Sequence, residues 1–199
     1  MDVSSPDTDE PGSRVKRLRQ ATAAAHDQLD RRVMAGRPFA DFKRYALFLQ
    51  VQYRFHAVVD PLYRDGALGH LLPDLDGRRR LALIKQDLLD VAGLIPGDAP
   101  QGHPGTIDPT GGLGWLYVAE GSSLGAAILL KEARKLGLSE AHGARHLAGH
   151  PDGRGLHWRQ FTSALDQVAL TGDGERRVAA GATEAFRFVH RLVGDAFGD

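Results

Sequence analysis

The sequence predicts an all-α globular domain, and three observations support this fold class. Apolar residues recur at spacings of three and four along most of the chain, and no stretch shows the strict alternation of a half-buried strand. Breaks between the apolar segments are short, except for one Gly- and Pro-rich stretch at 93–112. The 199 residues include no cysteine, so disulfides do not shape the fold. We therefore expect seven or eight helices packed around one core.

The expected helices have recognisable start and stop signals. Gly36-Arg37-Pro38 ends the first helix, Pro61 suits the first turn of a short helix, and Ser139 can cap another. Pro151-Asp152-Gly153 forms a turn, and Thr171-Gly172 separates the last two helices. The predicted helices cover about 13–35, 39–58, 61–68, 76–92, 112–136, 139–148, 156–169 and 173–197.

Composition limits the domain count and the class of partner. Lys+Arg and Asp+Glu both number 25, and this balance argues against a dedicated nucleic-acid-binding or membrane-surface protein. Residues 1–12 are polar and acidic and lack the apolar segment of a secretory signal, which predicts a disordered leader. No apolar run approaches the roughly 18 residues that a membrane span needs. We expect one domain, 13–199, in the cytoplasm.

A histidine shares a face of the first helix with apolar residues. His26 lies four residues after Thr22, eight after Leu18 and three before Leu29, and residues at these spacings stack on one side of a helix. The pattern predicts that His26 points into the interior. Either it is a core histidine satisfied by a hydrogen bond, or it is a ligand.

The long apolar segment at 112–136 contains an unusual number of glycines. Each interior glycine costs a helix roughly 1 kcal/mol relative to alanine, so repeated glycines need a geometric reason. Gly121 and Gly125 lie four apart and expose bare backbone on one face. Two explanations remain open: close packing of another helix, or close approach of a flat ligand. A planar macrocycle with a central metal would use both features, an axial nitrogen on one side and an unobstructed surface on the other.

Two segments resemble the haem oxygenase family. Residues 18–29 (LRQATAAAHDQL) are similar to the proximal helix of that family, and 114–125 (GWLYVAEGSSLG) are similar to its distal helix. Residues 143–148 (GARHLA) and the later Trp158, Phe161 and Leu165-Asp166 also resemble the bacterial type. That type serves haem-iron acquisition or the synthesis of bacteriophytochrome chromophore. The similarity runs from about residue 14 to 197.

The resemblance implies a single-domain helical fold that holds haem between the proximal helix and a kinked distal helix. It implies that haem, as both substrate and cofactor, is opened to biliverdin, CO and Fe²⁺. The reaction would use O₂ and electrons from a ferredoxin or an NAD(P)H-dependent reductase. A bacteriophytochrome or a haem-uptake carrier is a further partner that the resemblance suggests. A haem-binding carrier or sensor on the same fold remains the alternative, and a thiaminase-like enzyme is disfavoured because its catalytic Cys is absent.

The resemblance also assigns roles on the two faces of the ring. His26 would be the axial ligand of the iron. Gly121 and Gly125 would let the distal backbone approach the ring, with Ser122 between them in contact with haem. Arg80 matches a position that anchors ordered water in related proteins, although it also fits a solvated charge in the run Arg78-Arg79-Arg80.

Cations are expected where the two haem propionates lie. Arg19 is two helical turns before His26, Arg154 is a second candidate, and Tyr117 is four residues before Gly121. A surface cation or a packed aromatic is the alternative interpretation for each. Relatives that open haem at the δ carbon carry lysines at the positions of Met34 and Glu132, so we expect opening at the α-meso carbon.

A second metal site is conceivable on the spacing of three histidines. His142, His146 and His150 follow one another at intervals of four, and imidazoles at this spacing can hold zinc or copper on a helix. With nine histidines in the chain, this spacing also arises by chance.

Overall fold

The computed structural model describes residues 12–97 and 107–198. Within these ranges the chain forms seven α-helices and two short 3-10 helices and no β-strand, so the all-α prediction is confirmed. The helices are α1 (Arg14–Ala35), α2 (Phe42–Tyr63), α3 (Gly66–Leu71), η1 (Asp76–Arg78), α4 (Leu81–Ala92), α5 (Pro109–Lys135), η2 (Arg145–Leu147), α6 (Arg154–Gln167) and α7 (Gly172–Phe197). Of the predicted leader, only Gly12 belongs to the described residues.

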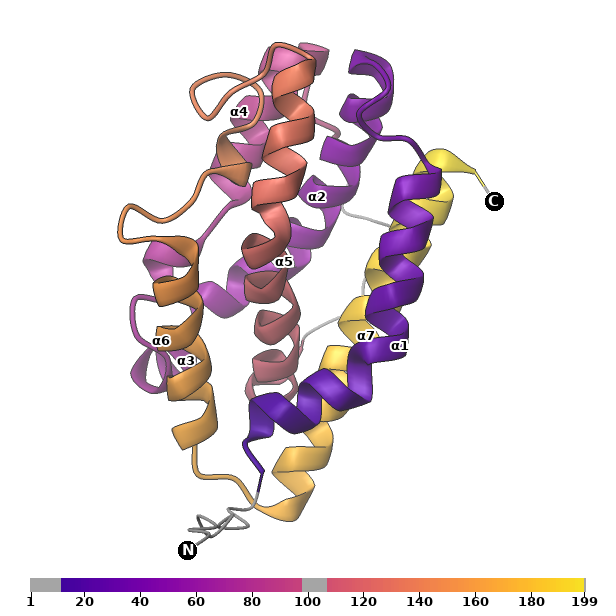
Figure 1. Ribbon diagram of the computed structural model, residues 1–199. Coiled ribbons are helices and arrows are strands. Elements are labelled where there is room, and N and C mark those ends of the chain that lie inside the picture. The colour runs from indigo at the N-terminus through magenta and orange to yellow at the C-terminus, as the bar shows by residue number, and fades with distance from the viewer. Residues whose placement is uncertain (1–11, 98–106, 199) are drawn as a thin grey trace, which may run out of the picture.

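Helix α5 runs through the middle of the molecule, with α1 and α7 on one side of it (Figure 1). Its most extensive packing is with α7, and glycines bring the two backbones together. A Cβ atom on Gly114 would lie 2.1 Å from the carbonyl oxygen of Val178, and one on Gly181 would lie 2.2 Å from that of Gly111. Only glycine allows this approach.

Helix α5 is long and apolar enough to cross a membrane by length and composition, which the sequence analysis did not recognise. However, 56% of its most apolar window is buried inside the protein, and Trp115 and Leu116 are fully buried. The helix is therefore the central helix of the core. One core cluster surrounds its first half, and a second cluster, built on Tyr45, Phe48 and Ile84, surrounds its last turns.

Several predicted boundaries are wrong for tertiary reasons. α2 continues past Pro61 to Tyr63, so Leu62 and Tyr63, predicted for a separate short helix, are buried in its last turn. The predicted helix at 76–92 is divided into η1 and α4. α5 begins at Pro109 because the side chain of Asp108 caps the amide of Gly111 at 3.0 Å.

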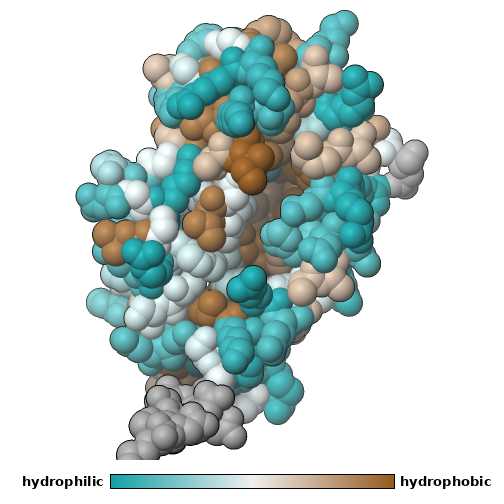
Figure 2. All heavy atoms as spheres, viewed as in Figure 1, coloured by the Kyte–Doolittle hydropathy of each residue, from teal (hydrophilic) through white to brown (hydrophobic). Residues whose placement is uncertain are grey.

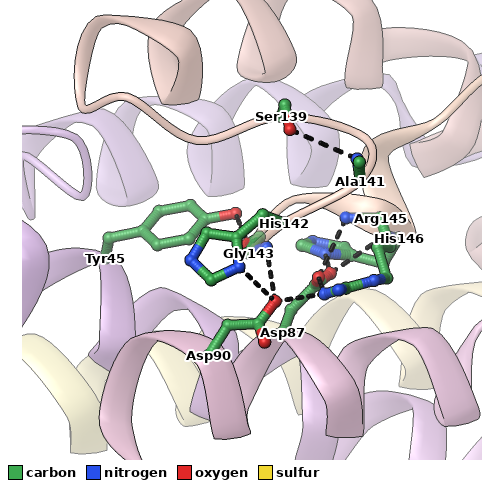
Figure 3. A network of polar contacts seen from close by, with 9 residues as sticks. All are labelled: Tyr45, Asp87, Asp90, Ser139, Ala141, His142, Gly143, Arg145 and His146. Atoms are coloured by element: carbon green, nitrogen blue, oxygen red, sulfur yellow. Dashed lines mark hydrogen bonds and ion pairs between the residues drawn. The ribbon is translucent and has the colours of Figure 1, made fainter.

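The predicted helix at 139–148 is absent, and two aspartates of α4 explain why (Figure 3). Asp87 accepts hydrogen bonds from the amides of Arg145 (2.9 Å) and His146 (3.0 Å), and Asp90 accepts one from the amide of Gly143 (2.8 Å). These amides are thereby bound by carboxylates, so only the 3-10 helix η2 forms here. Ser139 instead pairs with the backbone of His142.

Candidate functional site

A groove separates α1 from α5. α1 packs on α7 and α6 and makes little direct contact with α5. Figure 2 shows a hollow at this place, with apolar side chains in its depth between α5 and the polar outer face of α1. Three large apolar side chains of these two helices stay exposed: Met34 of α1 (55%) and Leu124 (43%) and Ile128 (71%) of α5. Exposed apolar residues on helices that border a groove are typical of a ligand site.

His26 lies on the open part of α1, and its predicted orientation into the interior is wrong. Leu18 and Thr22 of the same stripe are buried, whereas the side chain of His26 is 59% exposed. The stripe formed by Leu18, Thr22 and His26 becomes more exposed toward His26, because α5 makes little contact with α1. The imidazole lies edge-on to Phe186 of α7, with ring centroids 6.0 Å apart. Its Nδ1 atom is 3.3 Å from a carboxylate oxygen of Asp30.

The glycines of α5 differ in what surrounds them. A Cβ on Gly125 would meet no atom within 4 Å, and one on Gly121 would only touch the far edge of the Trp158 ring at 3.7 Å. Gly114, by contrast, is required by the packing of α7. Helix packing therefore explains the glycine in the first half of α5 but leaves Gly121 and Gly125 unexplained.

Arg19 of α1 lies near enough to Tyr117 of α5 for its charge to affect the tyrosine. Tyr117 is largely buried, which raises the pKa of its phenol, while the Arg19 guanidinium and the Thr22 hydroxyl act against this rise in pKa. Both predicted candidates for binding an acidic group are thus neighbours, one from α1 and one from α5. Arg19 itself is exposed.

Two other predicted residues already have protein partners. The Ser122 hydroxyl donates to the carbonyl of Ala119 at 2.7 Å. Arg154 of α6 donates to the carbonyl of Ser123 at 2.9 Å and to that of Leu147. Burial lowers the pKa of Arg154, and the charge of Arg80 adds to this effect. Arg154 therefore joins α6 to α5.

The three consecutive arginines 78–80 differ in burial and in their ion-pair partners. They are therefore not simply three solvated charges. Arg78 is buried and paired with Glu120 at 2.8 Å, and Arg79 pairs with the buried Asp60 at 2.9 Å. Arg80 is half-buried and has no hydrogen-bonding or ion-pairing partner among the described residues. It lines a small pocket together with Glu120 and Trp158.

The sequence analysis missed the buried polar network below this pocket. The carboxylate of Glu120 accepts a hydrogen bond from the Tyr63 hydroxyl at 2.7 Å and one from Arg78 at 2.8 Å. Burial and the neighbouring Glu120 raise the pKa of Tyr63 well above its usual value. Nothing in a linear charged run reveals that one arginine is buried. Asp30 was also missed, although its place four residues after His26 on the same helix was a usable signal.

The three histidines considered as a metal site are not brought together. His142 lies beside Asp90 (Nδ1 to Oδ2, 3.2 Å) and His146 beside Asp87 (Nδ1 to Oδ2, 2.8 Å; Figure 3). His150 instead stacks on His157, with ring centroids 4.2 Å apart. The predicted helix that would have aligned them does not form.

Comparisons with known proteins agree with this architecture. The family model described as "Heme oxygenase" matches residues 13–195. "Heme oxygenase PigA" of Pseudomonas aeruginosa is 38% identical over 186 residues, which are 94% of each chain. The NO- and CO-bound haem oxygenase of Neisseria meningitidis superposes with a TM-score of 0.89 and 42% identity, covering 94% of this chain and 92% of that one. The haem oxygenase of Leptospira interrogans, at 18% identity and a TM-score of 0.74, shares the fold. The chain therefore belongs to the haem oxygenase family.

Proposed function

We propose that this haem oxygenase binds haem in the groove between α1 and α5, with His26 as the axial ligand of the iron. Bound haem supplies the iron that activates O₂ and is itself the substrate, since its ring is opened to biliverdin with release of CO and Fe²⁺. The observation that carries the proposal is the open space at Gly125 of α5, together with an exposed histidine on α1, a helix that makes little direct contact with α5. A flat apolar ring suits two helices that expose Met34, Leu124 and Ile128.

His26 has the exposure and the neighbour that an axial ligand needs. A ligating imidazole must offer one nitrogen to the metal, and its other N–H is commonly held by a carboxylate. Asp30 lies within 3.3 Å of Nδ1, which leaves Nε2 for the iron. In this arrangement Asp30 sets the tautomer and the ring orientation of His26 and increases its basicity.

Gly121 and Gly125 supply the opposite wall. Bare backbone allows the helix to approach the ring plane and leaves room for a small gas on the iron. The Trp158 ring lies on the bare side of Gly121, with its far edge 3.7 Å from where a Cβ would be. Arg80, which is half-buried and unpaired among the described residues, is placed to hold ordered water at the pocket that it lines with Trp158.

The propionates define which ring edge faces the glycines. Arg19 is an exposed cation of α1 whose charge acts on Tyr117, and the Tyr117 phenol is a hydrogen-bond donor. Met34 and Glu132 cannot hold a rotated haem as lysines would, and Glu132 is paired with Lys135 at 2.7 Å. We therefore expect opening at the α-meso carbon. Electrons come from a ferredoxin or an NAD(P)H-dependent reductase.

Haem titration of the wild type and of His26→Ala tests the ligation. The wild type should form a complex with an intense Soret band and an imidazole-ligated iron. His26→Ala should lose this ligation, and added imidazole should restore it. His142→Ala is the matched control, because His142 is similarly exposed (60%) and lies beside a carboxylate at 3.2 Å. Unchanged ligation in His26→Ala would show that another residue is the ligand.

Chromatography of the biliverdin formed in a single turnover tests the regiochemistry. The α isomer should predominate in the wild type. Arg19→Glu, which reverses the charge at the propionate end, should lower haem affinity or mix the isomers. A product that is mainly the β or δ isomer contradicts the proposed orientation.

A further inference from the structure

Three side chains that the proposed haem chemistry does not use meet beside α6. They are Asp74, in the turn between α3 and η1, His150, in the loop before α6, and His157, in the first turns of α6. One potential ligand atom from each lies within 4.8 Å of those from the other two. The spacing in the sequence does not indicate this cluster, because Asp74 and His150 are 76 positions apart.

His157 has a buried nitrogen without a partner. The residue is 7% exposed, and its Nε2 atom forms no hydrogen bond within the part of the chain that the structure describes. The nearest carboxylate oxygen, Oδ2 of Asp74, is 3.9 Å away, which is beyond hydrogen-bonding distance. Leaving a buried polar atom unpaired costs about 1–3 kcal/mol, so a missing partner is expected here.

The carboxylate of Asp74 does not supply that partner, because its Oδ2 atom lies 3.9 Å from Nε2 of His157. A metal ion at Nε2 would satisfy the buried nitrogen, since a neutral imidazole binds metal ions through a ring nitrogen.

The other two side chains are placed to complete a metal site. The His150 ring stacks on His157 at an interplanar angle of 13°, and its side chain is 27% exposed. Asp74 has a left-handed backbone (φ 53°), which is strained for a non-glycine residue, and its carboxylate lies against Gly77, where a Cβ would be 2.3 Å from Oδ1. The backbone of Asp74 is thus held in an uncommon conformation that directs the carboxylate toward the histidines.

We propose that Asp74, His150 and His157 bind a divalent first-row transition metal ion such as Zn²⁺. Two imidazoles and one carboxylate are a common donor set for zinc with a fourth position open to water. Bonds of about 2.0–2.2 Å require the donors to approach one another by roughly 1 Å. The His150 ring must also turn out of the stack, so that its lone pair meets that of His157. Both movements involve loop residues, while His157 is fixed in α6.

The surrounding charges permit a cation at this position. The positive charge of Arg78 is balanced by Glu120, with which it is paired at 2.8 Å. Arg80 and Arg154 are further cations of the pocket that His150 and His157 line, and Asp74 carries the opposing negative charge. His150 and His157 line the same small pocket as Arg80 and Trp158, so a bound ion would lie beside the distal side of the proposed haem site. Its donors do not include His26, so zinc binding to the haem-free protein does not depend on haem ligation by His26.

Zinc titration of the haem-free, untagged protein by calorimetry tests the site. The protein is first freed of metal with a chelator that is then removed. The wild type should bind one equivalent of Zn²⁺, and Co²⁺ should give the visible absorption bands of a four-coordinate complex. His150→Ala, His157→Asn and Asp74→Asn should each weaken Zn²⁺ binding roughly tenfold or more. Circular dichroism establishes that each variant is folded.

Two control variants separate this site from other exposed histidines. His142→Ala removes a histidine beside Asp90, and His26→Ala removes one beside Asp30; both should keep wild-type Zn²⁺ affinity. If His157→Asn does not fold, the partly exposed His150 and Asp74 carry the test, since their replacement removes no core contact. Wild-type affinity in a folded His150→Ala and Asp74→Asn, or a wild type that binds no Zn²⁺, would overturn the proposal.

Discussion

The carboxylate of Asp30 lies one helical turn beyond His26, with Oδ2 3.3 Å from the imidazole Nδ1. Both side chains are mostly exposed, at 59% and 67%, so packing does not force them together. In a haem complex this pair would hold the imidazole in one orientation and make it a better donor to iron.

Asp30→Asn should weaken the iron–histidine bond and leave the fold intact. The amide carries no negative charge, so the imidazole becomes less basic. The iron–histidine stretching frequency in the resonance Raman spectrum of the ferrous complex should fall, and thermal stability should not change. Asp27→Asn is the control, because Asp27 is equally exposed and its carboxylate is 4.0 Å from Nδ1. Equal frequencies in both variants and the wild type would argue against a role for Asp30.

Two glycines of α5 should respond in opposite ways to added side chains. Gly125→Ala should stabilise the protein by up to about 1 kcal/mol, because the Cβ enters open space and alanine favours a helix. Gly114→Ala should cost about 1–3 kcal/mol or more, since its Cβ would overlap the backbone of Val178 and Ala182. Urea unfolding measures both changes.

A side chain at Gly125 should weaken haem binding although it does not destabilise the fold. Gly125→Leu should keep wild-type stability or exceed it, and yet bind haem more weakly, because its side chain would occupy the space next to the ring. A variant at Gly125 that binds haem as well as the wild type would place the ring elsewhere.

The sequence predicts the helices well because burial of one stripe imposes a period of 3.6 on them. It predicts less well which apolar helix faces are covered by another helix. The periodicity placed His26 inside, but it cannot distinguish a stripe that packs on a helix from one that borders a groove. The family resemblance pointed to the groove, and the open space at Gly125 is a fact of three-dimensional packing that no spacing encodes.

Tertiary polar contacts account for the remaining errors. The predicted helix at 139–148 failed because Asp87 and Asp90, more than 50 residues earlier, bind its amides. The meeting of Asp74 with His150 and His157 depends on the same long-range arrangement. Local propensity contains no information about such partners.

Removing one partner of the buried Arg78–Glu120 pair should be strongly destabilising. Arg78 is 1% exposed, so Arg78→Ala leaves the Glu120 carboxylate buried without its cation, at a cost of about 3–5 kcal/mol in the free energy of unfolding. Arg176→Ala, in an exposed pair with Asp173, should cost no more than about 1 kcal/mol. If Arg78→Ala lowers the free energy of unfolding as little as Arg176→Ala does, water must replace the guanidinium beside Glu120.

Acid should destabilise the protein partly through a buried histidine of α2. His56 is 5% exposed, and burial lowers its pKa to about 3, with smaller contributions from His146 and Arg80. The unfolded chain binds a proton on this histidine near pH 6.5, whereas the folded protein does not until about pH 3. The unfolded state therefore gains protons first, and stability falls as the pH decreases from about 6.5.

His56→Gln should reduce this pH dependence. Between about pH 6 and pH 4.5 one such histidine contributes a slope of up to about 1.4 kcal/mol per pH unit, and glutamine contributes none. Urea unfolding at several pH values measures the slope, with the exposed His70→Gln as the control that should retain it. Carboxylates titrate in the same range, but they are unchanged in both variants, so the difference between the two slopes isolates the imidazole. Identical slopes would mean that His56 accepts a proton inside the folded protein, which would require water to reach the core beside Phe55.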